Sequence, residues 1–405
     1  MTAEEPLRAE GPLRAEEPLR AEEPLRAGEP LHIGVNLLWC LPGAVGGSEQ
    51  YLVRQLAGLL QLTGDQASPP VRLTLFVTSA FRELHAATLD GCTFVDAPHD
   101  GHRRALRVWD ENTWLSSRTA QIDVVHHGGG TAPRRARRPY VLTIHDLQYR
   151  TFPQYFSGLK RRYLNTVVPG SARRAAAVAV PSDYVRQSVI AELGIARDRV
   201  HVVPHGYDPA LLVQRTPQDE LRRRYDLGND RVLVYPAMTA PHKRHDFLIE
   251  LMRHHWTDTD LRLVLIGGPG LADDDVQRAI AASAVDVRGR IVRPGRVSDA
   301  DRNGLLAMAE AMVFPSEYEG FGAPLIEAMA LGAPVICSDA TCLPDVAGDA
   351  AVVRPLRFEA WSSALEEVAE RRAQLVAAGH ARVQQFTALE SGRALLDVYR
   401  QAAAA

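Results

Sequence analysis

The feature that most constrains the fold is an alternation of short β-branched runs with helical stretches, which occurs twice along the chain. In the first half, six runs predict strands, at residues 31–38, 71–78, 123–129, 140–146, 175–182 and 199–206. After a polar connector helix, five more follow, at residues 231–238, 261–268, 289–294, 311–316 and 333–338. Strands that alternate with helices predict βαβ units and a parallel sheet in each half. We therefore expect two doubly wound α/β domains that enclose a cleft, because ligands bind at the carboxyl ends of such strands.

This pattern divides the chain into four segments. Residues 1–30 repeat a six-residue unit with proline at every sixth position, which blocks a continuous helix and buries too little apolar surface for a fold. We expect this segment to be a disordered tail. Residues 31–212 form the predicted N-terminal domain, and residues 213–385 form the C-terminal domain. Residues 386–405 predict a helix that packs back on the N-terminal domain.

Composition limits the class of protein. The chain has 46% hydrophobic and 23% charged residues, the balance of a globular protein, and lacks both a run of about 18 apolar residues and a secretory signal layout. A cytoplasmic protein is expected. The four cysteines are too scattered for a disulfide framework or a zinc site, so reduced thiols are predicted. Residues 31–212 carry 20 basic against 14 acidic residues, which fits either an anionic partner or a solvated surface.

The most informative segment is SEYEGFGAPLIEAMA, residues 316–330, at the junction of a predicted strand and a helix. Pro324 suits the first helical turn, and Gly320 and Gly322 let the backbone approach a ligand while the helix offers free N–H groups to phosphate. Glu319 and Glu327 are separated so that both carboxylates can bind hydroxyls along one elongated ligand. An ordinary capped helix with a solvated Glu327 is the alternative.

Other candidate residues follow the strands of both halves. Lys243 comes just after the first strand of the second half, where it can neutralise a diphosphate, although a surface lysine is also possible. His145 lies at the carboxyl end of the predicted strand at 140–146, where it would face the cleft or be an ordinary structural histidine, and Asp146 either orients it or caps the next turn. Gly46 and Gly47 lie in a βα turn that lets the backbone reach an anion. That last signal is weak alone.

Together these residues resemble glycosyltransferase family 4, whose signature has the form E-G-F-G-x-P-x-x-E-A. The likeness extends from about residue 31 to 400. It implies that Glu319 binds hydroxyls of a donor sugar and that Glu327 binds the ribose hydroxyls. It also implies that Phe321 and Gly322 present backbone amides to the sugar and the diphosphate, next to Gly320.

The resemblance also assigns roles outside this motif. His145 would contact the donor sugar near the reaction centre, and Lys243 would bind phosphate. Family members often carry an arginine five residues before that lysine, where this chain has Met238, so Arg244 is a candidate replacement. The backbone of Arg296 and Val297 would meet the nucleobase.

The implied protein is a retaining, metal-independent glycosyltransferase of GT-B fold, with two Rossmann-like domains facing a cleft. Its co-substrate is a nucleotide sugar and it needs no other cofactor. A mannose- or rhamnose-like hexose is favoured, and the acceptor hydroxyl belongs to a glycan, a lipid-linked or a small natural-product molecule. No nucleic-acid partner is expected. Basic residues of the N-terminal domain suit a phosphorylated or lipid-diphosphate acceptor, peripheral contact with the inner membrane face, or plain solvation: Arg134, Arg135, Arg137, Arg138, Lys160, Arg161 and Arg162.

Two alternatives differ in class. A nicotinamide-dependent oxidoreductase is also doubly wound, but no strand is followed by G-x-G-x-x-G, and Pro269 interrupts the nearest match. A catalytically silent sugar-nucleotide-binding homologue would keep the fold, and Met238 is the one hint of it. The acidic run at residues 273–275 predicts a solvated helix start rather than a metal site.

Overall fold

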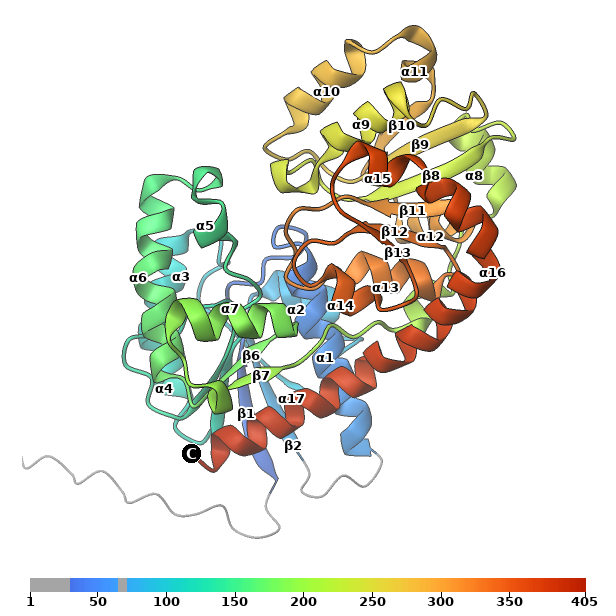
Figure 1. Cartoon of the computed structure of the whole chain (residues 1–405). Helices are drawn as coiled ribbons and strands as arrows, with labels where there is room; N and C mark the ends of the chain where they lie inside the picture. The colour runs from blue at the N-terminus through green and yellow to red at the C-terminus, as the bar shows by residue number, and fades with distance from the viewer. Residues whose placement is uncertain (1–29, 65–70) are drawn as a thin grey trace, which may run out of the picture.

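The computed structural model describes residues 30–64 and 71–405. The repeat that is expected to form a disordered tail lies outside the described residues, apart from Pro30. The described chain forms two α/β lobes, each built on a parallel sheet (Figure 1). None of the helices in these residues is both long and apolar enough to cross a bilayer.

The N-terminal lobe contains a seven-stranded sheet in the order β3-β2-β1-β4-β5-β6-β7, with all neighbours parallel. Its strands are β1 Leu31–Asn36, β2 Val71–Val77, β3 Thr93–Asp96, β4 Val124–His127, β5 Tyr140–Thr143, β6 Ala177–Val180 and β7 Val200–Val202. The helices of this lobe are α1 Gly47–Gly64, α2 Ser79–His85, α3 Arg104–Asp110, α4 Ser116–Arg118, α5 Gln148–Thr151, α6 Gly158–Arg174 and α7 Asp183–Leu193.

The C-terminal lobe repeats the arrangement with six parallel strands in the order β10-β9-β8-β11-β12-β13. They are β8 Arg231–Pro236, β9 Leu261–Ile266, β10 Ile291–Gly295, β11 Ala311–Phe314, β12 Val335–Ser338 and β13 Val352–Arg354. The helices that follow β7 are α8 Gln218–Arg224, α9 His245–His254, α10 Asp273–Ala281, α11 Val285–Gly289, α12 Asp299–Ala307, α13 Ala323–Ala330, α14 Leu343–Ala347, α15 Phe358–Ser362, α16 Ala364–Val383 and α17 Ala388–Ala403.

The predicted fold class is confirmed, and the differences are local. Central strands such as β4, β5 and β11 are buried along their whole length, as expected for parallel sheets covered on both faces. The two strands missing from the sequence prediction, β3 and β13, are short and lie at the sheet edges. Strand β5 ends at Thr143, so His145 lies two residues beyond it rather than on the strand.

The lobes are joined by two chain crossings that lie side by side. Tyr207 N donates to the Phe386 carbonyl at 2.8 Å, and Ala388 N donates to the Tyr207 carbonyl at 2.9 Å. After its crossing, α17 packs on α1, where Gly58 and Gly392 let the two backbones touch. Figure 1 shows α16 and α17 running from one lobe to the other. The last helix is therefore part of the N-terminal core although it follows the C-terminal lobe in sequence.

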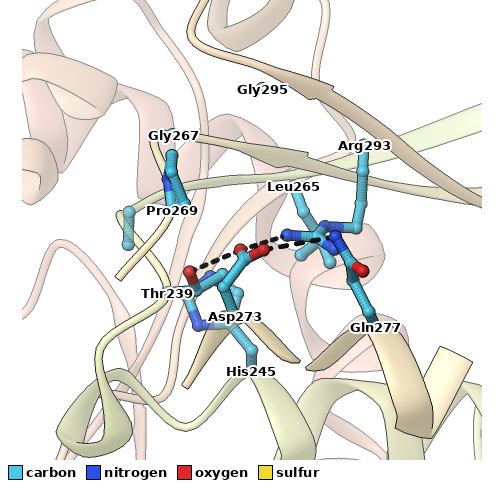
Figure 2. A pocket seen from close by; sticks show the side chains of 10 residues that line it. Thr239, His245, Leu265, Gly267, Pro269, Asp273, Gln277, Arg293 and Gly295 are labelled. Atoms are coloured by element: carbon cyan, nitrogen blue, oxygen red, sulfur yellow. Dashed lines mark hydrogen bonds and ion pairs between the residues drawn. The ribbon is translucent and has the colours of Figure 1, made fainter. Parts of the chain in front are cut away.

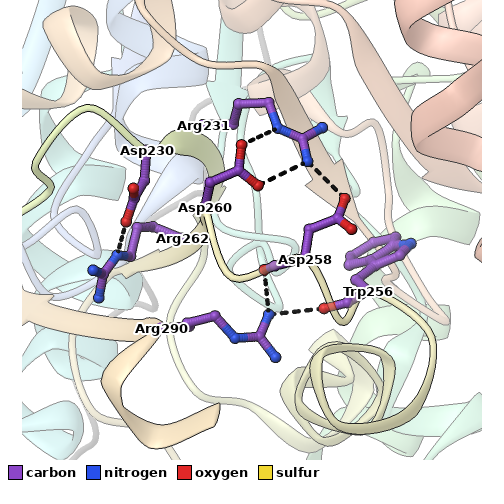
Figure 3. Close-up of polar contacts among 7 residues, drawn as sticks. All are labelled: Asp230, Arg231, Trp256, Asp258, Asp260, Arg262 and Arg290. Carbon is purple, nitrogen blue, oxygen red and sulfur yellow. Dashed lines mark hydrogen bonds and ion pairs between the residues drawn. The ribbon is translucent and has the colours of Figure 1, made fainter. Parts of the chain in front are cut away.

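A network of polar contacts joins residues around the amino ends of the C-terminal strands (Figure 3). Arg231, the first residue of β8, pairs with Asp258 at 2.6 Å and with Asp260 at 3.3 Å. Arg290 precedes β10 and donates to the carbonyls of Trp256 and Asp258 at 2.8 and 3.2 Å. Because these residues lie at the amino ends of the strands, the network joins strand entries and leaves the carboxyl ends for ligands.

Candidate active site

The centre of the candidate site is an ion pair at the carboxyl edge of the C-terminal sheet. Lys243 Nζ contacts Glu319 Oε1, and the two side chains are only 17% and 13% exposed. Lys243 ends a 3-10 turn after β8, where Tyr235 donates from its hydroxyl to the Lys243 carbonyl at 2.6 Å. Glu319 lies between β11 and α13. The site therefore holds a fixed cation beside a fixed acceptor of hydroxyl hydrogen bonds.

The loop that carries Glu319 is supported by residues that sequence reasoning missed. Thr341 accepts a hydrogen bond from Glu319 N at 3.1 Å, and Cys342 donates from Sγ to the Glu319 carbonyl at 3.3 Å. On its other side, Glu317 N donates to the His242 carbonyl at 2.8 Å. The loop is thus tied both to the turn before α14 and to the turn that carries Lys243. No signal marks Thr341 or Cys342 in the sequence, because both are ordinary loop residues.

The glycine loop is where the two lobes meet. A Cβ on Gly320 would come within 2.3 Å of the His145 carbonyl oxygen, so the backbones touch directly. Ser182 donates from Oγ to the Gly320 carbonyl at 2.6 Å, and Tyr318 accepts at its hydroxyl from Leu147 N at 3.1 Å. A side chain at position 320 would therefore clash with the His145 backbone, so only glycine fits there. The predicted donor-binding motif lies against the loop that carries His145.

Phe321 and Gly322 complete the turn into α13. The Phe321 ring is buried and stacks on His205 at a centroid distance of 4.8 Å, and His205 packs on Tyr51 of α1 at 4.3 Å. Gly322 has a left-handed backbone with φ of 89°, which favours glycine. The aromatic side chain therefore joins the lobes, and the backbone of the turn is what can face a ligand.

His145 is held in one orientation and one charge state. Its Nε2 lies 2.9 Å from the Gly128 carbonyl, which can only accept, so Nε2 carries the proton and Nδ1 is an acceptor. Tyr51 and Trp39 pack around the ring at centroid distances of 5.3 and 5.9 Å. Burial lowers the pKa of His145 to about 4, so the imidazole is neutral at pH 7.

Glu327 does not have a solvated carboxylate. Its Oε1 lies 2.8 Å from a guanidinium nitrogen of Arg54 on α1, and its Oε2 lies 3.9 Å from Arg302 on α12. The side chains of Arg54 and Glu327 are 8% and 12% exposed, so this is a buried ion pair between the lobes. Arg54 also donates to the Gly206 carbonyl at the crossing, at 3.4 Å. Sequence reasoning missed Arg54, which looks like any basic residue on an amphipathic helix.

The remaining predicted residues of the C-terminal lobe have contacts of their own. Arg244 is occupied by carboxylates: it contacts Glu317, and its Nε lies 3.1 Å from Asp246. The Arg244 guanidinium is therefore not free to replace the arginine that family members carry at the position of Met238. The Met238 side chain is 50% exposed. Arg296 is exposed and lies against Gly268, while Val297 packs on the C-terminal core.

Gly46 ends the turn before α1, and Gly47 is the first residue of that helix rather than part of the turn. Gly46 has φ of 62°, and the space beside both glycines is open. The turn is fixed by Glu49, which accepts from Gly43 N at 3.0 Å and pairs with His85 at 2.7 Å. In the described residues, no three His, Cys, Asp or Glu side chains converge as a metal site would require.

The prediction of a solvated helix start at residues 273–275 is wrong for Asp273. The acidic run was expected to be a solvated helix start, and α10 does begin at Asp273. The Asp273 carboxylate, however, is only 19% exposed and accepts from Thr239 Oγ1 at 2.8 Å and from Arg293 at 2.7 Å. Thr239 follows β8 and Arg293 lies on β10, on the other side of β9, so the local sequence gives no sign of this contact.

Two doubly wound domains that face each other across such a site have the GT-B fold. Residues 45–211 match the family described as Glycosyltransferase Family 4, and residues 217–381 match Glycosyl transferases group 1. The two matches together span most of the chain. The protein belongs to glycosyltransferase family 4.

Similar proteins agree with this assignment. The O-antigen chain mannosyltransferase B of Escherichia coli is 32% identical over 57% of this chain and 61% of its own length. The MMP alpha-(1->4)-mannosyltransferase of Mycolicibacterium hassiacum is 27% identical over 60% of this chain and 59% of its own length. This chain thus matches about three fifths of the length of either relative. The HepE protein of Anabaena, solved with UDP and glucose, has the same fold, with a TM-score of 0.70 at 18% identity over 91% of this chain and 98% of HepE.

Proposed function

We propose that this protein is a retaining, metal-independent glycosyltransferase that moves a hexose from a nucleotide sugar to an acceptor hydroxyl. The observation that carries the proposal is the Lys243–Glu319 pair, which lies in the C-terminal lobe against the loop that carries His145 in the N-terminal lobe. A cation, a carboxylate and a neutral imidazole at one lobe boundary suit a diphosphate with a sugar attached. A mannose-like sugar is favoured because the two relatives described above are named mannosyltransferases.

In this proposal the diphosphate, the sugar and the ribose of the donor each have a binding residue. Lys243 and the amino end of α13 neutralise the diphosphate. Glu319 accepts hydrogen bonds from sugar hydroxyls, and Glu327 does the same for the ribose while it remains paired with Arg54. The unprotonated Nδ1 of His145 can accept from a further sugar hydroxyl, because its Nε2 proton is committed to Gly128.

The transfer step exchanges one bond at the anomeric carbon for another on the same face. The bond from that carbon to the diphosphate oxygen breaks. As the diphosphate departs, the acceptor oxygen forms a bond to the same carbon. The acceptor proton passes to the leaving phosphate oxygen, so the products are a glycoside and a nucleoside diphosphate. The protein contributes positioning and charge stabilisation through Lys243, and supplies no nucleophile.

The N-terminal lobe would bind the acceptor, whose hydroxyl belongs to a glycan, a lipid-linked or a small natural-product molecule. An open pocket of about 530 Å³ there is lined by Arg150, Arg161 and Asn165 among others. Leu159, beside it on α6, is 83% exposed. Arg150 is paired with Glu192, which also lines the pocket, so the exposed Arg161 next to exposed apolar surface is what suits a phosphorylated, amphipathic acceptor.

The test is the release of nucleoside diphosphate from a panel of UDP, GDP, ADP and dTDP sugars, with and without candidate acceptors and with EDTA present. Turnover of one donor is expected, with a loss of about 100-fold or more in Lys243→Ala and Glu319→Gln. Arg253→Ala, on α9 and away from the site, is the control. Binding without turnover of any donor would favour the catalytically silent homologue, and no binding at all would refute the proposal.

A further inference from the structure

A second polar pocket lies beside the ion pair and has no role in the proposed function so far. It measures about 270 Å³ and opens at the carboxyl ends of β8, β9 and β10 (Figure 2). Its polar lining comes from Thr239, His245, Asp273, Gln277 and Arg293. Gly295 also lines it, directly before the Arg296 loop that is expected to meet the nucleobase. Since β10 lies two strand spacings, about 10 Å, from β8, a nucleoside that extends from a diphosphate at Lys243 can reach this pocket.

The charged groups of the pocket are fixed in place. Asp273 Oδ1 receives hydrogen bonds from Thr239 and Arg293, while Oδ2 receives a longer one, 3.3 Å, from Gln277. Thr239 is itself fixed, because its Oγ1 accepts from Gly270 N at 2.7 Å. The Thr239 hydrogen bond and the Arg293 charge hold the pKa of Asp273 below its usual value. The carboxylate is therefore a charged acceptor at a defined position, with capacity left on Oδ2.

The other polar residues of the pocket add no second negative charge beside Asp273. Burial lowers the pKa of His245 to about 4, so its ring is neutral at pH 7. Arg293 donates to Oδ1 through one nitrogen, and its guanidinium has further N–H groups. Gln277 can donate or accept. The pocket thus offers a carboxylate acceptor next to a guanidinium donor.

This pairing discriminates among nucleobases. Guanine carries two adjacent donors, N1–H and the 2-amino group, beside the acceptor O6. Asp273 accepts from these donors at Oδ2, because Oδ1 already accepts from Thr239 and Arg293, while a further N–H of Arg293 donates to O6. Uracil places a carbonyl on each side of its single N–H, so a carboxylate there meets two oxygens of like polarity. Adenine lacks the pair of adjacent donors.

We propose that Asp273, held by Thr239 and Arg293, selects guanine, so that the donor is a guanosine diphosphate sugar. The inference rests on the proposed function, because it assumes a nucleotide at Lys243. It deepens that function by naming the donor class. Asp273 is then a specificity residue, and the contacts that hold it are part of base recognition rather than of helix capping alone.

The test is calorimetric binding of free GDP, IDP, UDP and ADP to the full chain. GDP is expected to bind tightest. IDP lacks only the 2-amino group and should bind about 10- to 100-fold more weakly, and UDP and ADP about 100-fold more weakly or worse. UDP or ADP binding as tightly as GDP, or IDP equal to GDP, would overturn the inference and leave the proposed function standing. Failure of all four, and of dTDP, to bind would overturn both.

The variant Asp273→Asn tests the residue. Both contacts to Oδ1 are donors, so the amide oxygen keeps that position and the NH₂ group replaces Oδ2. GDP affinity should fall about 10- to 100-fold, and xanthosine diphosphate, with an oxygen in place of the 2-amino group, should then bind better than GDP. Asp275→Asn is the control, since Asp275 lies on the same turn, is 73% exposed and pairs with Arg278. An unchanged order of preference would contradict the assignment, and the wild-type comparison of GDP with IDP decides it if the variant does not fold.

Discussion

The ion pair between Arg54 and Glu327 is the contact whose removal has the most definite consequence. Arg54→Met keeps the length and apolar stem of the side chain and removes the charge. Glu327 is then left 12% exposed, with Arg302 at 3.9 Å as its nearest described cation. Removing one partner of a buried pair costs about 3–5 kcal/mol. Because Arg302 and residual solvent compensate in part, we expect a loss of about 2–3 kcal/mol.

This loss should appear as a lower melting temperature, by about 5–10 °C for lobes of this size. Glu327→Gln in the Arg54→Met background removes the unpaired charge, so the double variant should be more stable than the sum of the single losses implies. The difference measured by this cycle is the coupling energy, expected at about 1–2 kcal/mol. Arg302→Met is the matched control, since it faces the same carboxylate from a longer distance and should cost less than about 1 kcal/mol.

The assay is thermal and urea unfolding of the four proteins and the control, followed by circular dichroism. Because Arg54 and Glu327 lie on different lobes, Arg54→Met should also separate the unfolding of the two lobes into distinguishable transitions. If Arg54→Met is no less stable than Arg302→Met, or if the single losses add without coupling, the interpretation of this pair as a buried link between the lobes is wrong.

Three further predictions follow from single contacts. Gly320→Ala should lower turnover more than about 10-fold, because its Cβ would lie 2.3 Å from the His145 carbonyl and force the lobes apart; normal kinetics would contradict the close approach. Stability should fall below pH 6.5, because burial lowers the pKa of both His126 and His127 to about 3 while the unfolded chain titrates near 6.5. The unfolded state then binds more protons between these values, which costs up to about 3 kcal/mol per pH unit for the two together, and a melting temperature that is flat from pH 7 to 5 would contradict this. Met238→Arg should tighten nucleoside diphosphate binding several-fold at low salt, with the gain shrinking at high salt in a calorimetric titration.

The fold could be predicted because its signals are local. Buried parallel strands are near-continuous β-branched runs, and the motif around Glu319 is contiguous in sequence. The edge strands β3 and β13 were missed because strands of four and three residues carry too little pattern. The family resemblance supplied the roles of Glu319 and Lys243, and the structure brings these two side chains into contact.

The partners of the site residues could not be predicted. Arg54 reaches Glu327 only because the lobes close on each other, and an arginine on an amphipathic helix is unremarkable in sequence. Thr341 supports Glu319 from a turn that is distant in sequence. Asp273 resembles its two acidic neighbours and differs from them only because β8 and β10 bring Thr239 and Arg293 to it. Such contacts depend on packing between elements, which a periodic pattern does not encode.

The sequence itself offers a direct test of the nucleotide site, because Lys160 and Lys243 are its only lysines. Lys160 is exposed on α6, and Lys243 is 17% exposed beside Glu319. Trace acylation of the whole chain, with and without a saturating nucleoside diphosphate and quantified by mass spectrometry, compares the two in one sample. The account predicts that nucleotide lowers the labelling of Lys243 several-fold and leaves Lys160 unchanged. Labelling of Lys243 that is unaffected by every nucleoside diphosphate, or protection of Lys160 instead, would contradict it.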